Sequence, residues 1–104
     1  MASPMRTISL PSGDQIPVLG QGTWGLGESR ARRSSEIAAL RRGLDIGMNL
    51  IDTAEMYANG DAEILVGEAI AGHREEVFLV TKVWPHNTRP GRARCRPARA
   101  ACGG

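Results

Sequence analysis

Short apolar runs, separated by polar and turn-forming segments, divide most of the chain into strands and helices. Residues 7–10 and 15–19 are strand-length runs on either side of turn formers at 11–14, and this pattern predicts an opening β-hairpin. Two further apolar runs, at residues 48–51 and 77–81, also have the length of strands. We therefore expect a hairpin followed by strands that lie far apart in the sequence.

Two segments between these runs carry apolar residues at three- and four-residue steps, which predicts helices with one apolar face. In the first segment, Ser34 or Ser35 is the expected N-cap and Gly47 the expected stop. In the second, Asp61 is the expected cap and Gly72 the expected end. The predicted apolar faces consist of Ile37, Leu40 and Leu44 in the first helix and Leu65, Ala69 and Ile70 in the second.

The alternation of strands and helices predicts an α/β fold with a parallel sheet covered by helices. In such folds, functional residues lie just beyond the carboxyl ends of the strands. Glycine, polar and aromatic residues follow three of the predicted strands at these positions: Gly22, Thr23 and Trp24, then Asp52 and Tyr57, then Lys82 and Trp84. We take these seven residues as candidates for a functional site.

The chain has 104 residues, of which 41% are hydrophobic, and this length allows one small domain. Its apolar runs are too short to span a membrane, and its N-terminus lacks the charged and apolar regions of a signal peptide. We therefore expect a cytoplasmic protein without a membrane partner.

The net charge of +2 combines two segments of opposite sign. Residues 1–87 hold eight basic and eleven acidic residues, a charge of −3, whereas residues 88–104 hold five arginines and no acid, a charge of +5. Cys95 and Cys102 also lie in this last segment, so the rest of the chain implies no disulfide framework. Twelve of the thirteen basic residues are arginine, which makes the single lysine, Lys82, a candidate for function.

The glycine-rich segment at residues 20–27 is predicted to be a loop, and it contains the spacing Gly20-x-Gly22-x-x-Gly25 of a dinucleotide-binding fingerprint. That fingerprint needs a helix to begin at its end, where backbone N–H groups face a pyrophosphate. Here no helical periodicity begins until the middle thirties, and Asp45, the acid twenty residues further on, falls inside a predicted helix. A flexible loop is therefore favoured over a Rossmann site.

Asp52, Tyr57 and Lys82 form the second candidate site, at the ends of two neighbouring predicted strands. Reduction of a carbonyl needs a proton donor, and an ordinary tyrosine, with a pKa of about 10, holds its proton tightly. A nearby ammonium lowers the pKa of a tyrosine, and a carboxylate beside the ammonium keeps it charged and oriented. Taken singly, the three residues also fit a turn former, a half-buried aromatic ring and a solvated strand end.

Residues 47–57, Gly-Met-Asn-Leu-Ile-Asp-Thr-Ala-Glu-Met-Tyr, resemble the signature of the aldo-keto reductases. Residues 22–24, Gly-Thr-Trp, and 80–84, Val-Thr-Lys-Val-Trp, resemble that family after its first and third barrel strands. The resemblance covers residues 7–87. It implies the N-terminal part of a TIM (β/α)₈ barrel and NADPH-dependent reduction of aldehydes and ketones to alcohols, as in prokaryotic reductases of methylglyoxal or diketo-gluconate.

The resemblance also implies roles for the candidate residues. Tyr57 would be the proton donor, Lys82 would lower its pKa, and Asp52 would hold Lys82. NADPH would contact Gly22, Thr23, Trp24 and Asp52, and a small carbonyl substrate would contact Trp24, Tyr57 and Trp84. A monomer without a nucleic-acid partner is implied as well. Two parts of the family's site lack a counterpart here, namely the catalytic histidine after the next strand and the grip on the adenosine phosphate.

Residues 88–104 show neither helical nor strand periodicity and contain no large apolar residue. An arginine-rich arm for nucleic acid fits poorly because no aromatic residue is present to stack on bases. A zinc site from Cys95, Cys102 and His86 fits poorly because a fourth ligand is absent, and we expect no metal site. We expect instead a disordered tail translated out of frame, after a single-nucleotide frameshift between Asn87 and Cys95.

The strand at residues 77–81 would then be an uncovered apolar edge, and such an edge favours aggregation. We expect the truncated chain alone to be insoluble or only partly ordered, and catalytically inactive. The alternative function is a small non-catalytic module that binds phosphate or a polyanion through the glycine loop or the basic tail.

Overall fold

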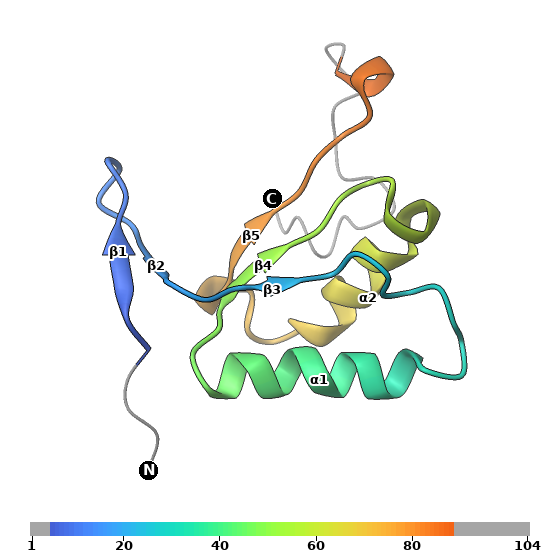
Figure 1. Cartoon of the computed structure of the whole chain (residues 1–104), viewed down its shortest axis with the longest axis horizontal. Coiled ribbons are helices and arrows are strands. Elements are labelled where there is room, and N and C mark those ends of the chain that lie inside the picture. Colours follow the sequence, from blue (N-terminus) through green and yellow to red (C-terminus); the bar gives the residue numbers. More distant parts are fainter. Residues whose placement is uncertain (1–4, 89–104) are drawn as a thin grey trace.

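The computed structural model describes residues 5–88, which contain five strands and two α-helices (Figure 1). In chain order they are β1 (Thr7–Ser9), β2 (Gln15–Pro17), β3 (Gln21–Gly22), α1 (Arg33–Asp45), β4 (Leu50–Asp52), α2 (Asp61–Ala69) and β5 (Phe78–Val80). Three short 3₁₀ turns lie at Tyr57–Gly60, Arg74–Glu76 and Pro85–Asn87. Among these residues, no helix is long and apolar enough to cross a membrane.

The opening hairpin is confirmed. Strands β1 and β2 pair antiparallel, with Ile8 opposite Ile16, and Gly13 takes a positive φ of 93° in the turn between them. Figure 1 shows the hairpin beside the body of the molecule. The second strand ends at Pro17, earlier than predicted; Val18 N still donates to the Arg6 carbonyl oxygen, but Val18 and Leu19 are exposed and do not extend the strand.

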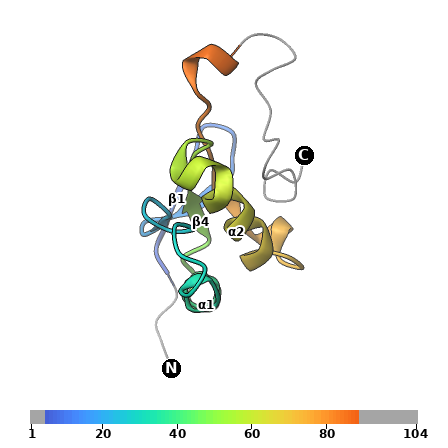
Figure 2. The same cartoon turned by 90° about the vertical axis from the view of Figure 1, so that its right-hand side faces the viewer.

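The parallel sheet is also confirmed. Its order is β3-β4-β5, with β4 in the centre, and the three strands end level because Asp52 is the register partner of both Gly22 and Val80. Helices α1 and α2 connect the strands and pack against each other beside the sheet (Figure 2). Each strand therefore delivers the residues that follow it to the same end of the sheet.

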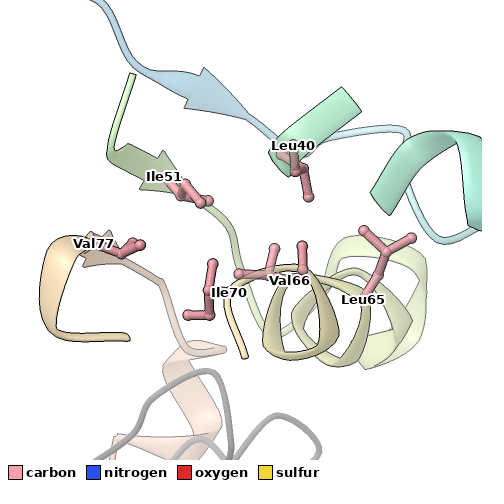
Figure 3. Close-up of a cluster of buried hydrophobic side chains, with 7 residues drawn as sticks. Leu40, Ile51, Leu65, Val66, Ile70 and Val77 are labelled. Atoms are coloured by element: carbon pink, nitrogen blue, oxygen red, sulfur yellow. The ribbon is translucent and has the colours of Figure 1, made fainter. Parts of the chain in front are cut away.

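The buried core lies between α2, α1 and β4 (Figure 3). The two predicted helix faces supply most of it, and Ile51 of β4 is fully buried between them. The buried core residues are Leu40, Ile51, Leu65, Val66, Ala69, Ile70 and Val77, with Ile37 and Leu44 partly buried against them. The helical spacing of apolar residues thus identified the correct faces of both helices.

The prediction of a loop over residues 20–27 is wrong at its start, where Gln21 and Gly22 form β3. The Gln21 amide holds this strand in place, because its Nε2 donates to the carbonyl oxygens of Leu40 (3.1 Å) and Met48 (3.0 Å). Glycine at position 20 permits close pairing, since a Cβ there would lie 2.9 Å from the Leu50 carbonyl oxygen. These are long-range contacts, which local turn propensity does not reveal.

Both predicted N-caps are wrong. Arg32 occupies the N-cap of α1 without a side-chain cap hydrogen bond, and Ser35 Oγ instead donates to the Arg32 carbonyl oxygen at 2.9 Å. Gly60, with φ 98°, is the N-cap of α2, which makes Asp61 the first helical residue. The predicted stops agree better, because both Gly47 and Gly72 take positive φ shortly after their helices end.

The expectations for the basic tail lie outside the described residues. They concern its disorder, its frameshift and the cysteines Cys95 and Cys102. In residues 5–88, no cluster of three or more histidine, cysteine or acidic side chains could hold a metal ion.

Candidate active site

The level carboxyl ends of β4 and β5 bring Asp52 and Lys82 together. Lys82 Nζ donates to Asp52 Oδ1 at 2.9 Å and to the Thr53 carbonyl oxygen at 3.0 Å. The chains beyond the two strands stay paired, because Thr53 N donates to the Val80 carbonyl oxygen and Glu55 N to that of Lys82, both at 2.8 Å. The predicted convergence of these two side chains is therefore present in the structure.

The Tyr57 ring lies beside the same ammonium group. Lys82 Nζ is 5.2 Å from the centroid of the Tyr57 ring, within the range of a cation–π contact. Partial burial lowers the pKa of Lys82, but its hydrogen bond to Asp52 and its interaction with Tyr57 outweigh that effect and raise the pKa above its usual value. The ammonium is thus kept protonated beside the phenol ring.

A left-handed turn directly follows Tyr57. Ala58 (φ 51°), Asn59 (φ 55°) and Gly60 (φ 98°) all have positive φ, and then α2 begins. This conformation costs about 1 kcal/mol at an alanine, which has a Cβ, and less at asparagine or glycine. The strain lies next to the candidate proton donor, as is common at functional sites.

The segment after β3 carries the predicted cofactor residues, and they differ in accessibility. Trp24 is 83% exposed, and a Cβ at Gly22 would meet no atom within 4 Å, so both border open space. Thr23 is fully buried, and both its N and its Oγ1 lie 3.0 Å from the Asp52 carbonyl oxygen, to which they donate. Thr23 thus holds the backbone at Asp52 and offers no surface of its own.

The segment after β5 presents Trp84, the third predicted pocket residue. Trp84 is 45% exposed and stacks on His86, with ring centroids 5.9 Å apart and an interplanar angle of 23°. The 3₁₀ turn at Pro85–Asn87 follows it, and in Figure 1 this segment projects beyond the sheet. Trp84 is therefore accessible at the same end of the sheet as Tyr57 and Lys82.

Two acids with structural roles were missed by the sequence analysis. Glu55 accepts hydrogen bonds from Trp84 N and Asn87 Nδ2, both at 2.7 Å. Glu63 of α2 is buried and accepts from Thr81 Oγ1 at 2.6 Å, while its Oε1 has no partner among the described residues. The signal for Glu63 was its place three and seven residues before Val66 and Ile70, on the apolar face of its helix.

The structure also shows where the glycine spacing and the acid of the rejected dinucleotide-binding site lie. The helix after the glycine spacing begins only at Arg33, and Asp45 is the last residue of α1 rather than a residue after a strand. This arrangement does not aim a helix N-terminus at a phosphate, and it agrees with the rejection of a Rossmann site.

Comparison with known proteins gives a consistent result. A model of the Aldo/keto reductase family matches residues 18–100. Methylglyoxal reductase YeaE of Escherichia coli (strain K12) is 60% identical over 77 residues, which cover 73% of this chain and 27% of that protein. Methylglyoxal reductase DkgA of the same organism is 37% identical over 87 residues, covering 81% of this chain and 28% of that protein.

Solved structures show the same relationship. An aldo/keto reductase from Klebsiella pneumoniae, in complex with NADP and acetate, is 42% identical and superposes with a TM-score of 0.84, covering 95% of this chain and 36% of that one. The aldo-keto reductase Tm1743, in complex with the inhibitor epalrestat, gives a TM-score of 0.81 at 36% identity. The chain thus spans between 27% and 38% of the length of these relatives, and its strands correspond to part of their barrel.

Proposed function

This chain belongs to the aldo/keto reductase family of oxidoreductases, and from that premise we propose that it carries the proton-donating part of a site that reduces small aldehydes and ketones to alcohols with NADPH. The similarity to two methylglyoxal reductases supports a small carbonyl substrate. Structures of related proteins with NADP or NADPH support the choice of cofactor.

The residues at the carboxyl ends of the strands fit the nicotinamide end of such a cofactor. Asp52 uses Oδ1 for Lys82, and its Oδ2 has no hydrogen-bond partner within residues 5–88, so it is available to a ribose hydroxyl. The space in front of Gly22 and the exposed indole of Trp24 border the same region. When bound, the reduced nicotinamide supplies the hydride for the carbonyl carbon.

In this proposal, the protein's own side chains supply the proton that the carbonyl oxygen receives. The Tyr57 hydroxyl donates its proton to the carbonyl oxygen as negative charge develops there. The Lys82 ammonium stabilises the charge left on the phenol oxygen, and Asp52 orients that ammonium. Trp84 and Trp24 form apolar walls for the substrate.

One observation carries the proposal. Lys82 is the single lysine of the chain, and its Nζ lies 2.9 Å from Asp52 Oδ1 and 5.2 Å from the ring of Tyr57, the single tyrosine. These two contacts hold the ammonium between a carboxylate and a phenol ring, although its side chain is 45% exposed. The three residues form one arrangement, as an acid–base site requires.

The test uses a hybrid barrel, because the chain spans only 27% of YeaE. The matching segment of YeaE is replaced by that of this chain, and oxidation of NADPH is followed with methylglyoxal as the probe substrate. We expect an active hybrid in which Tyr57→Phe lowers kcat by about 10²-fold or more, the size of a lost general acid. NADPH should still quench tryptophan fluorescence in that variant.

Glu75→Gln is the matched control, since the Glu75 side chain is exposed and makes no hydrogen bond within the described residues; the activity of this variant should equal that of the parent hybrid. Full activity of the Tyr57→Phe hybrid, or an inactive parent hybrid that folds and binds NADPH, would contradict the proposal.

A further inference from the structure

Glu55 is an acid that the proposed mechanism does not use, although it lies between Asp52 and Tyr57 in the sequence. It bonds three times to the segment after β5. Its N donates to the Lys82 carbonyl oxygen, its Oε2 accepts from Trp84 N, and its Oε1 accepts from Asn87 Nδ2. Both carboxylate oxygens are therefore used by N–H donors some thirty residues away in the chain.

The two side-chain hydrogen bonds of Glu55 connect the turn that carries Trp84 to the rest of the molecule. Within the described residues, no other hydrogen bond joins residues 83–88 to the rest of the molecule, because the remaining ones run within the turn itself. Asn87 N donates to the Trp84 carbonyl oxygen at 2.8 Å, and Trp84 stacks on His86, so the turn and the indole are linked to each other. A contact that holds this turn in place therefore also restrains the Trp84 indole.

The bonds are short and charge-assisted. Both N···O distances are 2.7 Å, at the short end for a carboxylate acceptor, and such bonds are about twice as strong as neutral ones. No cation lies within bonding distance of Glu55 among the described residues, so the carboxylate acts as a double acceptor and not as half of an ion pair. A glutamine at this position could accept from only one of the two donors.

We propose that Glu55 is a positioning residue: its carboxylate holds the turn of Trp84 beside the loop of Tyr57 and so sets the wall of the substrate pocket. The pocket role of Trp84 rests on the proposed function, whereas the mechanical role of Glu55 does not. Because Glu55 is not among the groups that shift the pKa of Lys82, its removal should free the indole and leave the Lys82–Asp52 pair intact.

The first experiment uses the full chain with Trp24→Phe, so that Trp84 is the single tryptophan, and measures quenching of its fluorescence by acrylamide. Glu55→Ala should raise the quenching constant by about twofold, Glu55→Gln and Asn87→Ala by less because each leaves one bond, and Glu75→Gln by nothing. Titration of isotope-labelled Lys82, followed by NMR at Cε, should give the same midpoint in all of these variants, because the Lys82–Asp52 contact stays in place.

The proposal is wrong if Asn87→Ala and Glu55→Gln both leave Trp84 as protected as in the parent. These two variants test the positioning role even where Glu55→Ala fails to fold, since each keeps one of the two side-chain hydrogen bonds of residue 55.

A second experiment uses the hybrid barrel. Glu55→Ala should raise KM for methylglyoxal by about tenfold while kcat changes less than about twofold, the pattern of lost substrate binding. An equal fall of kcat with unchanged KM would overturn the pocket role. An inactive parent hybrid counts against the proposed function alone, because the quenching series needs neither cofactor nor catalysis.

Discussion

Lys82 shows at the scale of a single residue how position changes chemistry. Its side chain is 45% exposed, so solvent screens its ion pair with Asp52, and we expect that pair to contribute little to global stability. The ion pair instead affects the protonation of Lys82. Asp52 and Tyr57 together overcome the effect of burial and raise the pKa of Lys82.

We predict that the pKa of Lys82, followed by NMR at its isotope-labelled Cε, lies above the usual lysine value of about 10.4 in the folded chain. Its stabilising contribution is then complete below the unfolded-state pKa and is lost as pH rises through the folded-state pKa. Asp52→Asn should lower the midpoint, because burial then opposes the charge with less compensation. Asp61→Asn, which removes an acid that does not act on Lys82, should leave it in place. An unchanged midpoint in Asp52→Asn would show that the ion pair does not form in solution.

Ala58 gives a second prediction at this scale. Its φ of 51° lies in the left-handed region, so Ala58→Gly should raise the free energy of unfolding by about 0.5–1 kcal/mol. Asn59→Gly is the matched comparison and should change it less, because asparagine tolerates this region. Chemical denaturation of the variants measures both. A loss of stability in Ala58→Gly would mean that the turn is not left-handed in solution.

At the scale of elements, strand β3 and helix α1 depend on one side chain. A Cβ at Gly43 of α1 would lie 2.1 Å from Gln21 Oε1, which would displace the amide from its hydrogen bonds to Leu40 and Met48. The glycine is therefore required by the strand, although it is unfavourable for the helix.

Because of this dependence, the effect of Gly43→Ala on the free energy of unfolding should change sign when Gln21 is removed. Gly43→Ala should destabilise the chain by about 1 kcal/mol, because two lost hydrogen bonds outweigh the gain of about 1 kcal/mol in helix propensity. In a Gln21→Ala background, where those bonds are already absent, the same substitution should stabilise by about that gain. Thermal or urea unfolding of the four proteins gives the comparison, and equal effects in both backgrounds would refute the coupling.

At the scale of the whole molecule, the described sheet has two edges, β3 and β5, and β5 is the apolar one. Val80 at its end is 37% exposed. Exposed apolar edge strands pair with other chains, and this is the physical basis for expecting aggregation. Covering strands, as in the barrels of the related structures, would remove that edge.

We predict that Val80→Thr slows aggregation of the chain, because it keeps β-propensity while it removes exposed apolar surface from the edge. Val18→Thr is the matched control: Val18 is 49% exposed but lies at the end of the hairpin, where its N donates to the Arg6 carbonyl oxygen, and it is not part of the β5 edge. Light scattering at equal concentration compares the two variants. Equal slowing by both would indicate that total exposed apolar surface, and not the edge, drives association.

The sequence alone determined what depends on local pattern. Apolar spacing identified the buried faces of α1 and α2, turn formers identified the hairpin, and the β/α order placed Asp52, Tyr57 and Lys82 at one end of a parallel sheet. These features follow from neighbours a few residues apart, because side-chain periodicity records which face of an element is buried.

Only the tertiary structure decided the features that depend on contacts between distant segments. Strand β3 exists because Gln21 reaches Leu40 and Met48, and the role of Glu55 appears only when Trp84 and Asn87 lie beside it. The Asp52–Lys82 pair likewise joins residues thirty positions apart, at a distance set by strand register. Register fixes which groups meet, and a linear pattern of polar and apolar residues does not specify those partners.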